Sequence, residues 1–229
     1  MTPSQAGATV EGSRRARPGL TRDKILGAAL KLVDEHGLSA LTMRSLGAEL
    51  GVDPMAVYKH LDNKDAVLDG VAELLWSEID LPDDEALGWK ERLRLIARAL
   101  RTLAHSHPNA FALLFRRCLS EPALRVFDAQ LDALERAGLT RDLAAQGVRA
   151  LITYAVGYGM AELSPLLMSQ LQGNDVSDVQ RVMRVVQSLP QGLSPHLAEV
   201  ACIVCECDLD AQFDFGLDLI INGLEAQLV

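Results

Sequence analysis

The chain has 229 residues, of which 49% are hydrophobic, and a formal net charge of −9 at pH 7. This length suits one small module joined to a larger body, and the negative charge excludes a surface built for general binding of nucleic acids or membranes. The charge is uneven: residues 1–64 hold nine Lys and Arg against seven Asp and Glu, whereas residues 65–229 hold thirteen against twenty-four. We therefore expect only the first part to meet an anionic partner.

The chain opens with a polar segment, residues 1–20, that has little to bury and is predicted to be a flexible basic arm. Its first twelve residues lack the apolar core of a signal peptide. The least charged region, residues 150–174, contains Pro165 and no apolar run of about 18 residues, so a membrane span is not expected. These features predict a cytoplasmic protein.

Apolar residues recur at helical spacing almost throughout, and alternating strand patterns are absent, which predicts an all-α fold. A first helix is expected to begin after Thr21 and to end at Gly37. A second helix is expected over Met43–Leu50, with Thr42 as its N-cap and Gly51 at its end.

The third helix has a clear start, because Asp53 is a good N-cap and Pro54 suits the first helical position. Its expected length, like that of the second helix, is about eight residues. A fourth helix is predicted from near Asn63 to about Ile79. We place the domain boundary in the segment DLPDDEALG that follows.

The predicted domains are an arm over residues 1–20, a helix-turn-helix domain over 21–68 whose last helix continues to about 80, and a helical body over 85–229. Pro and Gly residues divide the body into predicted helical segments. These segments lie near 87–105, 109–119, 122–137, 141–169, 177–188, 194–207 and 210–228.

The second and third helices, joined by the short turn GVD, have the layout of a helix-turn-helix. Five apolar residues are expected to lock this pair against the first helix: Leu46, Ala48, Val52, Val57 and Leu61. The outward face of the third helix is partly basic, and such a face fits the major groove of DNA.

The exposed residues of this face differ in their chemistry. Lys59 can bind a guanine edge or a phosphate, and Arg44 can reach a guanine from the second helix. Short or apolar side chains that can touch a thymine methyl are Pro54, Met55 and Ala56. Side chains suited to phosphate oxygens are Thr42, Tyr58 and Lys64.

The N-terminal domain of the tetracycline-repressor (TetR) family resembles the segment ILGAALKLVDEHGLSALTMRSLGAELGVDPMAVYKHLDNKDAVLDGV. The terminal helix of the tetracycline-repressor subgroup is similar to FDFGLDLIINGLEAQL near the end of the chain. The resemblance implies a ligand-responsive transcriptional repressor that is not an enzyme. It would bind a palindromic operator of double-stranded DNA as a homodimer and be released by a small-molecule inducer.

The resemblance also implies a set of DNA contacts, which are Thr42, Met43, Arg44, Pro54, Met55, Ala56, Tyr58, Lys59, His60 and Lys64. Met55 and Lys59 depart from the tetracycline repressors, so the operator sequence is not transferable. The arm residues Arg14, Arg15 and Arg17 enter a neighbouring minor groove in one interpretation and form a solubilising tail in the other.

A ligand pocket in the body is expected to be mostly apolar with a few polar groups. Candidates for its lining, each of which could instead be plain core, are Phe111, Phe115, Arg116, Tyr154, Tyr158, Met160, Glu162 and Met183. Tetracycline repressors use a histidine in the segment that reads FALLFRRCLS here. Its absence argues against magnesium-tetracycline as the inducer. Arg116 and Arg117 indicate either an anionic or carbonyl-rich ligand or an exposed pair.

Dimerisation is predicted to use the segments 141–168 and 210–228, which would form a four-helix bundle with a second copy. The small residues Gly157 and Gly216 either permit close approach of two helices or only mark bends. The apolar residues that supply contact area are Leu217, Ile220, Ile221 and Leu224. We also expect Trp76 and Ile79 to pack against helices of the body.

No cofactor or metal site is predicted. The cysteines Cys202, Cys205 and Cys207 lack a fourth ligand of suitable spacing. They are interpreted as small apolar residues on a helix or as a redox-sensing cluster. The alternatives to a ligand-responsive repressor are therefore a helical protein-interaction module and a regulator switched by cysteine oxidation. Motifs of the common hydrolases and nucleotide-binding enzymes are absent.

Overall fold

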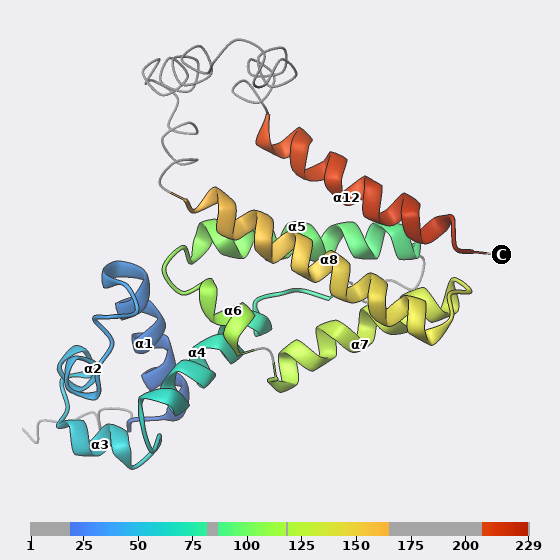
Figure 1. Ribbon diagram of the computed structural model, residues 1–229. Helices are drawn as coiled ribbons and strands as arrows, with labels where there is room; N and C mark the ends of the chain where they lie inside the picture. The colour runs from blue at the N-terminus through green and yellow to red at the C-terminus, as the bar shows by residue number, and fades with distance from the viewer. Residues whose placement is uncertain (1–18, 82–86, 118, 165–207, 229) are drawn as a thin grey trace, which may run out of the picture.

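The computed structural model describes residues 19–81, 87–117, 119–164 and 208–228, and in these ranges the chain forms helices and no strands (Figure 1). The all-α fold class predicted from the sequence is confirmed. The helices are α1 (Arg22–His36), α2 (Met43–Leu50), α3 (Pro54–Tyr58), α4 (Lys64–Ser77), α5 (Trp89–Ser106), α6 (Ala112–Arg116), α7 (Glu121–Arg136), α8 (Arg141–Glu162) and α12 (Leu209–Glu225).

The first four helices form a small N-terminal head, and polar side chains fix where each begins. The Thr21 hydroxyl accepts the Lys24 N–H at the start of α1, and the Asp53 carboxylate accepts the Met55 N–H at the start of α3. Thr42 forms a reciprocal capping box with Ser45 at α2. The predicted starts of these three helices are confirmed because such caps satisfy otherwise unbonded N–H groups.

Helix α3 is shorter than predicted, with five residues instead of about eight. The carbonyl of Val57 accepts the N–H groups of both His60 and Leu61, which turns the chain and buries Leu61. Asn63 then caps α4 by accepting the Ala66 N–H. The early cap of α4 leaves no room for a longer α3.

The turn between α2 and α3 depends on two glycines. Gly51 has φ +65° and ψ 32°, the left-handed conformation that glycine adopts most easily. Gly47 is buried, and a Cβ atom there would lie 3.1 Å from the Pro54 nitrogen and 3.1 Å from the Val52 oxygen. The prediction that Ala48 locks α2 to α1 is wrong: Ala48 is exposed, and Gly47 faces inward in its place.

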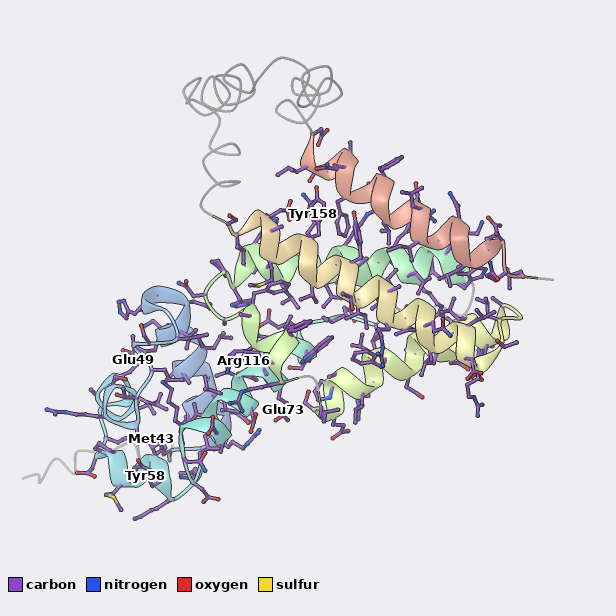
Figure 2. The ribbon with its side chains drawn as sticks, viewed as in Figure 1. Met43, Glu49, Tyr58, Glu73, Arg116 and Tyr158 are labelled. Atoms are coloured by element: carbon purple, nitrogen blue, oxygen red, sulfur yellow. The ribbon has the colours of Figure 1, made fainter. Side chains whose placement is uncertain are left out.

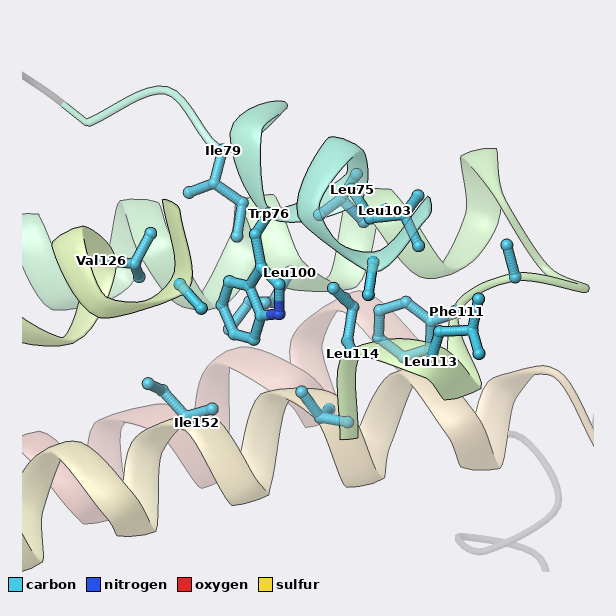
Figure 3. Packing of buried hydrophobic residues seen from close by; sticks show 14 of the residues in the cluster. Leu75, Trp76, Ile79, Leu100, Leu103, Phe111, Leu113, Leu114, Val126 and Ile152 are labelled. Carbon is cyan, nitrogen blue, oxygen red and sulfur yellow. The ribbon is translucent and has the colours of Figure 1, made fainter. Parts of the chain in front are cut away.

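Helix α4 connects the head to the body (Figure 1). Trp76, in its last turn, and Ile79, just after its end, are buried (Figure 3). The centroid of the Trp76 ring lies 6.0 Å from that of Phe127 on α7. The predicted packing of Trp76 and Ile79 on the body is confirmed. The last helix of the head is thereby part of the hydrophobic core of the body.

The body is built on α5, α7 and α8, with α12 lying along α5 and α8. Helix α6 has five residues and is shorter than the segment 109–119 predicted for it. Helix α8 ends at Glu162, before the predicted end at 169. The predictions for the arm, for the segments 177–188 and 194–207, for Met183 and for the cysteine cluster fall outside the described residues, as does most of the predicted domain boundary.

Candidate DNA-binding face and ligand cavity

The predicted DNA contacts lie together on one end of the head, around α3 and the start of α2. Met55 is 66% exposed and Tyr58 is 42% exposed. Figure 2 shows Tyr58 and Met43 at the end of the head away from the body. Other exposed candidates are Thr42, Arg44, Lys59 and His60, and those that are partly buried are Met43, Pro54, Ala56 and Lys64. The arrangement offers hydroxyl, ammonium and guanidinium groups beside short apolar side chains.

Two of these candidates already make contacts inside the head. The Thr42 hydroxyl accepts the Ser45 N–H at 3.0 Å and donates to the Ser45 hydroxyl at 3.0 Å. The Lys64 Nζ lies 3.5 Å from the Leu38 carbonyl oxygen. The Thr42 hydroxyl is already bonded to Ser45, so a phosphate would have to share it. Lys64 keeps N–H donors available because its ammonium group has three of them.

An apolar cavity of about 490 Å³ lies among α4, α6, α7 and α8, at the C-terminal end of α4. Its volume is in the range of pockets that hold small organic ligands. The residues that line it are Trp76, Leu114, Phe115, Leu119, Leu124, Phe127, Leu131, Ala145, Val148, Arg149, Ile152, Thr153 and Val156. Of the candidates from the sequence, Phe115 alone among those described lies in this wall.

The sequence carries a signal for this cavity in the spacing of apolar residues on two helices. Leu124, Phe127 and Leu131 share one face of α7. Four apolar residues of α8 at helical spacing line the same cavity, and these are Ala145, Val148, Ile152 and Val156. Both faces are typical of core helices. Whether two such faces touch or leave a space depends on how the helices are set apart by their neighbours, which spacing alone does not predict.

Trp76 brings a polar group to this apolar wall. Its indole Nε1 is buried and has no hydrogen-bond partner among the described residues. Figure 3 shows the nitrogen on the side of the ring that faces Leu114, another lining residue. A buried N–H without an acceptor is rare in proteins and is destabilising.

The tyrosines expected in the pocket face the opposite side of α8, toward α12. The Tyr154 hydroxyl donates to the Phe213 carbonyl at 2.8 Å, and the Tyr158 hydroxyl donates to the Leu209 carbonyl at 2.9 Å. Both rings pack against the Phe213 ring, with centroids 5.5 and 5.1 Å away. The contacts attach α12 to α8, and burial raises the pKa of Tyr154.

Glu162 also lies away from the apolar cavity. It is 1% exposed, and its carboxylate accepts two hydrogen bonds from Arg101 Nε and one from Nη2, at 2.6 to 3.1 Å. His105 Nε2 lies 3.1 Å from the same carboxylate. The hydrogen bond with Glu162 is the main reason that the pKa of Arg101 is raised. This buried group is a structural ion pair in the single chain.

Two further candidates lie outside the apolar cavity. Phe111 is fully buried, and its ring packs against Gly159 on α8. Arg116 is exposed at the end of α6, between the head and the body in Figure 2. It lines a second, polar pocket of about 570 Å³ with Asp69, Arg117, Leu119 and Ser120.

The predicted dimerisation residues divide into two groups. Leu217 and Ile221 are buried within the single chain, at 1% and 0% exposure, because they pack against its own helices. They therefore contribute to the core of the single chain, and their part in a partner interface stays a prediction. A Cβ atom on Gly216 would collide with the Tyr154 ring, so this glycine also serves contacts inside the chain.

The remaining dimerisation candidates are Gly157, which is exposed, and Ile220 and Leu224, which are partly buried. Large exposed apolar residues occur beside them on the same two helices. Phe215 and Leu219 lie one turn apart on α12, and Met160 lies on α8. Met160 is a pocket candidate in the sequence and not an interface one, and the sequence pattern singles out neither Phe215 nor Leu219.

Within the described residues, His, Cys, Asp and Glu form no group of three or more that could hold a metal ion. Over the same residues, each helix is too short or too polar to cross a membrane.

Comparisons with known proteins place both parts of the chain. Residues 25–71 match the family described as bacterial regulatory proteins, tetR family, and residues 81–228 match the tetracyclin repressor-like C-terminal domain. An HTH-type transcriptional regulator of Saccharopolyspora erythraea is 35% identical over 66% of this chain and 65% of its own length, so the chain spans less than two thirds of that relative. The class A tetracycline repressor of Escherichia coli is 30% identical over 90% of each chain.

Solved structures are also similar. ActR of Streptomyces coelicolor in complex with actinorhodin has a TM-score of 0.79 and 29% identity, covering 91% of this chain and 98% of ActR. BioQ with its double-stranded DNA operator has a TM-score of 0.62 and 26% identity, covering 91% of this chain and 99% of BioQ.

Proposed function

This chain belongs to the TetR family of bacterial regulatory proteins, which are transcriptional regulators and not enzymes, and from that premise we propose how it works as a repressor. Two copies bind a palindromic operator in the cytoplasm, and a small molecule that enters the apolar cavity releases them. The repressor function is supported by the similar tetracycline repressors, the ligand by ActR with actinorhodin, and the DNA by BioQ with its operator.

The observation that carries the proposal is the continuity of α4. This helix begins at Lys64, a short turn after α3 ends at Tyr58, and its last turn places Trp76 in the wall of the cavity. A ligand that changes the packing around Trp76 therefore acts on the helix that holds the recognition helix. Such a ligand shifts the equilibrium only by its difference in affinity for the two head positions. A coupling free energy of about 1–3 kcal/mol is typical.

The DNA contacts are assigned to the exposed face of α3 and the start of α2. Met55, Pro54 and Ala56 would make apolar contacts with base edges. Lys59 and Arg44 would donate hydrogen bonds to base edges from their charged groups. The contacts that position the head on the sugar-phosphate backbone would come from Tyr58, Lys64, Thr42, Met43 and His60. The acidic body stays away from the DNA because like charges repel.

The homodimer would form through α8 and α12, in a four-helix bundle. Exposed Phe215, Leu219 and Met160 support this arrangement because they form apolar surface on the two helices that lie side by side. Gly157 allows a second helix to approach α8 closely.

The test is selection of random double-stranded DNA by the purified full-length protein, with sequencing of the retained pool. We expect a palindrome whose half-sites lie about one helical turn or a little more apart, because two heads related by a two-fold axis read successive major grooves. A retained pool with no palindrome at low salt would contradict the proposal. Met55→Asp serves as the matched control, since it disables the face without altering the buried core.

A further inference from the structure

We propose that the apolar cavity and the polar pocket beside it form one site for an apolar organic acid, a molecule with a hydrophobic ring system and a carboxylate. The proposal rests on the proposed function, because it names the chemical class of the inducer. Leu119 lines both spaces and is 86% exposed, so the two spaces share a lining residue at the surface. The apolar part of the ligand would occupy the cavity of about 490 Å³, and its charged end would reach the arginines.

The charges around this site are unusual for an acidic body. In the described body, a carboxylate accepts from each of Lys90, Arg94, Arg98, Arg101, Arg117, Arg125, Arg136 and Arg141. Arg92 bonds to the Leu87 carbonyl. Arg116 and Arg149 have no acidic partner among the described residues, and Arg116 lines the polar pocket while Arg149 lines the apolar cavity.

Arginine is suited to a carboxylate because its planar guanidinium can donate two parallel hydrogen bonds. Arg117, next to Arg116, is already occupied: it contacts Asp69 and lies 2.7 Å from Asp65, both on the first turns of α4. Arg116 and Arg149, which lack such a partner in the described ranges, are therefore the ones that would receive the ligand. A carboxylate beside Arg117 would also compete with Asp65 and Asp69, and so weaken the hold of the body on α4.

The buried N–H of Trp76 adds a second requirement. It is a donor with no acceptor among the described residues, in a wall that is otherwise apolar except for Arg149 and Thr153. A ligand with a carbonyl or hydroxyl oxygen on its ring system would satisfy it. The class is thus an aromatic or alicyclic acid that carries at least one further oxygen.

Fluorescence can test the charge requirement directly, because the chain has two tryptophans and Trp89→Phe leaves Trp76 as the reporter in the cavity wall. The probes are 2-anthracenecarboxylate and 2-anthracenecarboxamide, which have the same ring and differ in charge. In the full-length Trp89→Phe protein at low salt, we expect both to quench Trp76 and the carboxylate to bind at least about tenfold more tightly.

In this background, Arg116→Gln and Arg149→Gln should each reduce the preference for the carboxylate severalfold, and the double variant should abolish it. Arg125→Gln, which removes an exposed arginine on α7 paired with Glu121, is the matched control and should leave the preference unchanged. Equal binding of the two probes, a preference that survives in the double variant, or no binding of either probe would overturn the proposal.

Release of the selected operator by the carboxylate is measured separately, so that the two proposals can fail independently. An arginine-dependent preference without release would show that the site binds organic acids and would overturn their role as the inducer. Failure to select any operator would reject the proposed function while leaving the result of the quenching experiment intact.

Discussion

The Nδ1 atom of His107 lies 2.7 Å from a carboxylate oxygen of Asp34, and this contact joins the body to the first helix of the head. The other ring nitrogen, Nε2, lies 3.0 Å from Glu78 at the end of α4. Asn109 adds a hydrogen bond to the Asp34 backbone oxygen at 2.8 Å. The imidazole therefore lies between two carboxylates at the junction of α1, α4 and the segment after α5.

This bridge predicts a stability that depends on pH. Burial by itself lowers the pKa of His107, but Asp34 and Glu78 favour the charged ring, and the net effect raises the pKa above 6.5. A raised folded-state pKa contributes stability that is complete below about pH 6.5 and is lost as the pH rises through the raised value. His107→Gln should lower the free energy of unfolding by about 1–2 kcal/mol near pH 6 and by less near pH 9.

Urea titrations of the variant and the parent protein across this range measure the difference. The matched control is His36→Gln, an exposed histidine in the last turn of α1, which should change stability by no more than about 0.5 kcal/mol. A His107→Gln effect that is the same at both ends of the range would show that the ring does not act as a cation.

Close packing of α5 on α8 predicts a strong effect of one added methyl group. A Cβ atom on Gly159 would lie 2.8 Å from the Ala104 Cβ and 3.0 Å from the Phe111 ring, neither of which can turn away. Gly159→Ala should therefore destabilise the protein by about 1–3 kcal/mol, as overpacked cores do. Gly27 is exposed on α1 with no described atom within 4 Å of an added Cβ.

Gly27→Ala is thus the control of opposite sign, and it should stabilise the protein by up to about 1 kcal/mol because alanine favours the helix. Thermal unfolding of both variants against the parent checks the pair. Equal and small shifts in Tm for both would mean that α5 and α8 are less closely packed than the structure has them.

The features predicted correctly from the sequence are those set by neighbouring residues. Thr21, Thr42 and Asp53 are predictable as caps because a cap bonds to an N–H two or three residues away. The fourth helix was expected to reach the body, since its apolar residues continue past the head to Trp76. The family resemblance was visible for the same reason: its motif is one continuous segment.

The features that were not predicted depend on which helix faces meet. Tyr154 was expected in the ligand pocket, yet its hydroxyl bonds to α12 at a sequence separation of more than fifty residues. Leu217 was assigned to a dimer interface, because an apolar face looks alike whether it meets its own chain or another one. Its neighbour Phe215, on the exposed side of α12, was not assigned to anything.

The exposed face of α12 predicts how the dimer can be broken. Phe215 is 66% exposed, and a charge at its position would have to be buried in the proposed four-helix bundle, which is unfavourable. Phe215→Asp should therefore give a monomer in light scattering and weaken operator binding at least about tenfold, since one head alone makes half of the contacts.

Met55→Asp, equally exposed but in the head, should lose operator binding and remain a dimer. A dimeric Phe215→Asp protein would move the interface elsewhere.

The salt dependence of DNA binding separates a phosphate contact from a lysine that only supports the head. Lys64 lies in the first turn of α4, just after the exposed α3, and its Nζ is 3.5 Å from the Leu38 carbonyl. If it also binds a phosphate, Lys64→Ala removes one neutralised charge per subunit. The slope of log affinity against log salt should then become shallower by about 1 for each phosphate that is no longer neutralised, and affinity should fall for every sequence tested. Lys90→Ala, which removes a lysine paired with Glu225 in the body, should leave the slope unchanged.

Fluorescence anisotropy of a labelled operator over a range of salt concentrations gives both slopes. An unchanged slope for Lys64→Ala, with lower protein stability, would assign this lysine to the Leu38 contact alone.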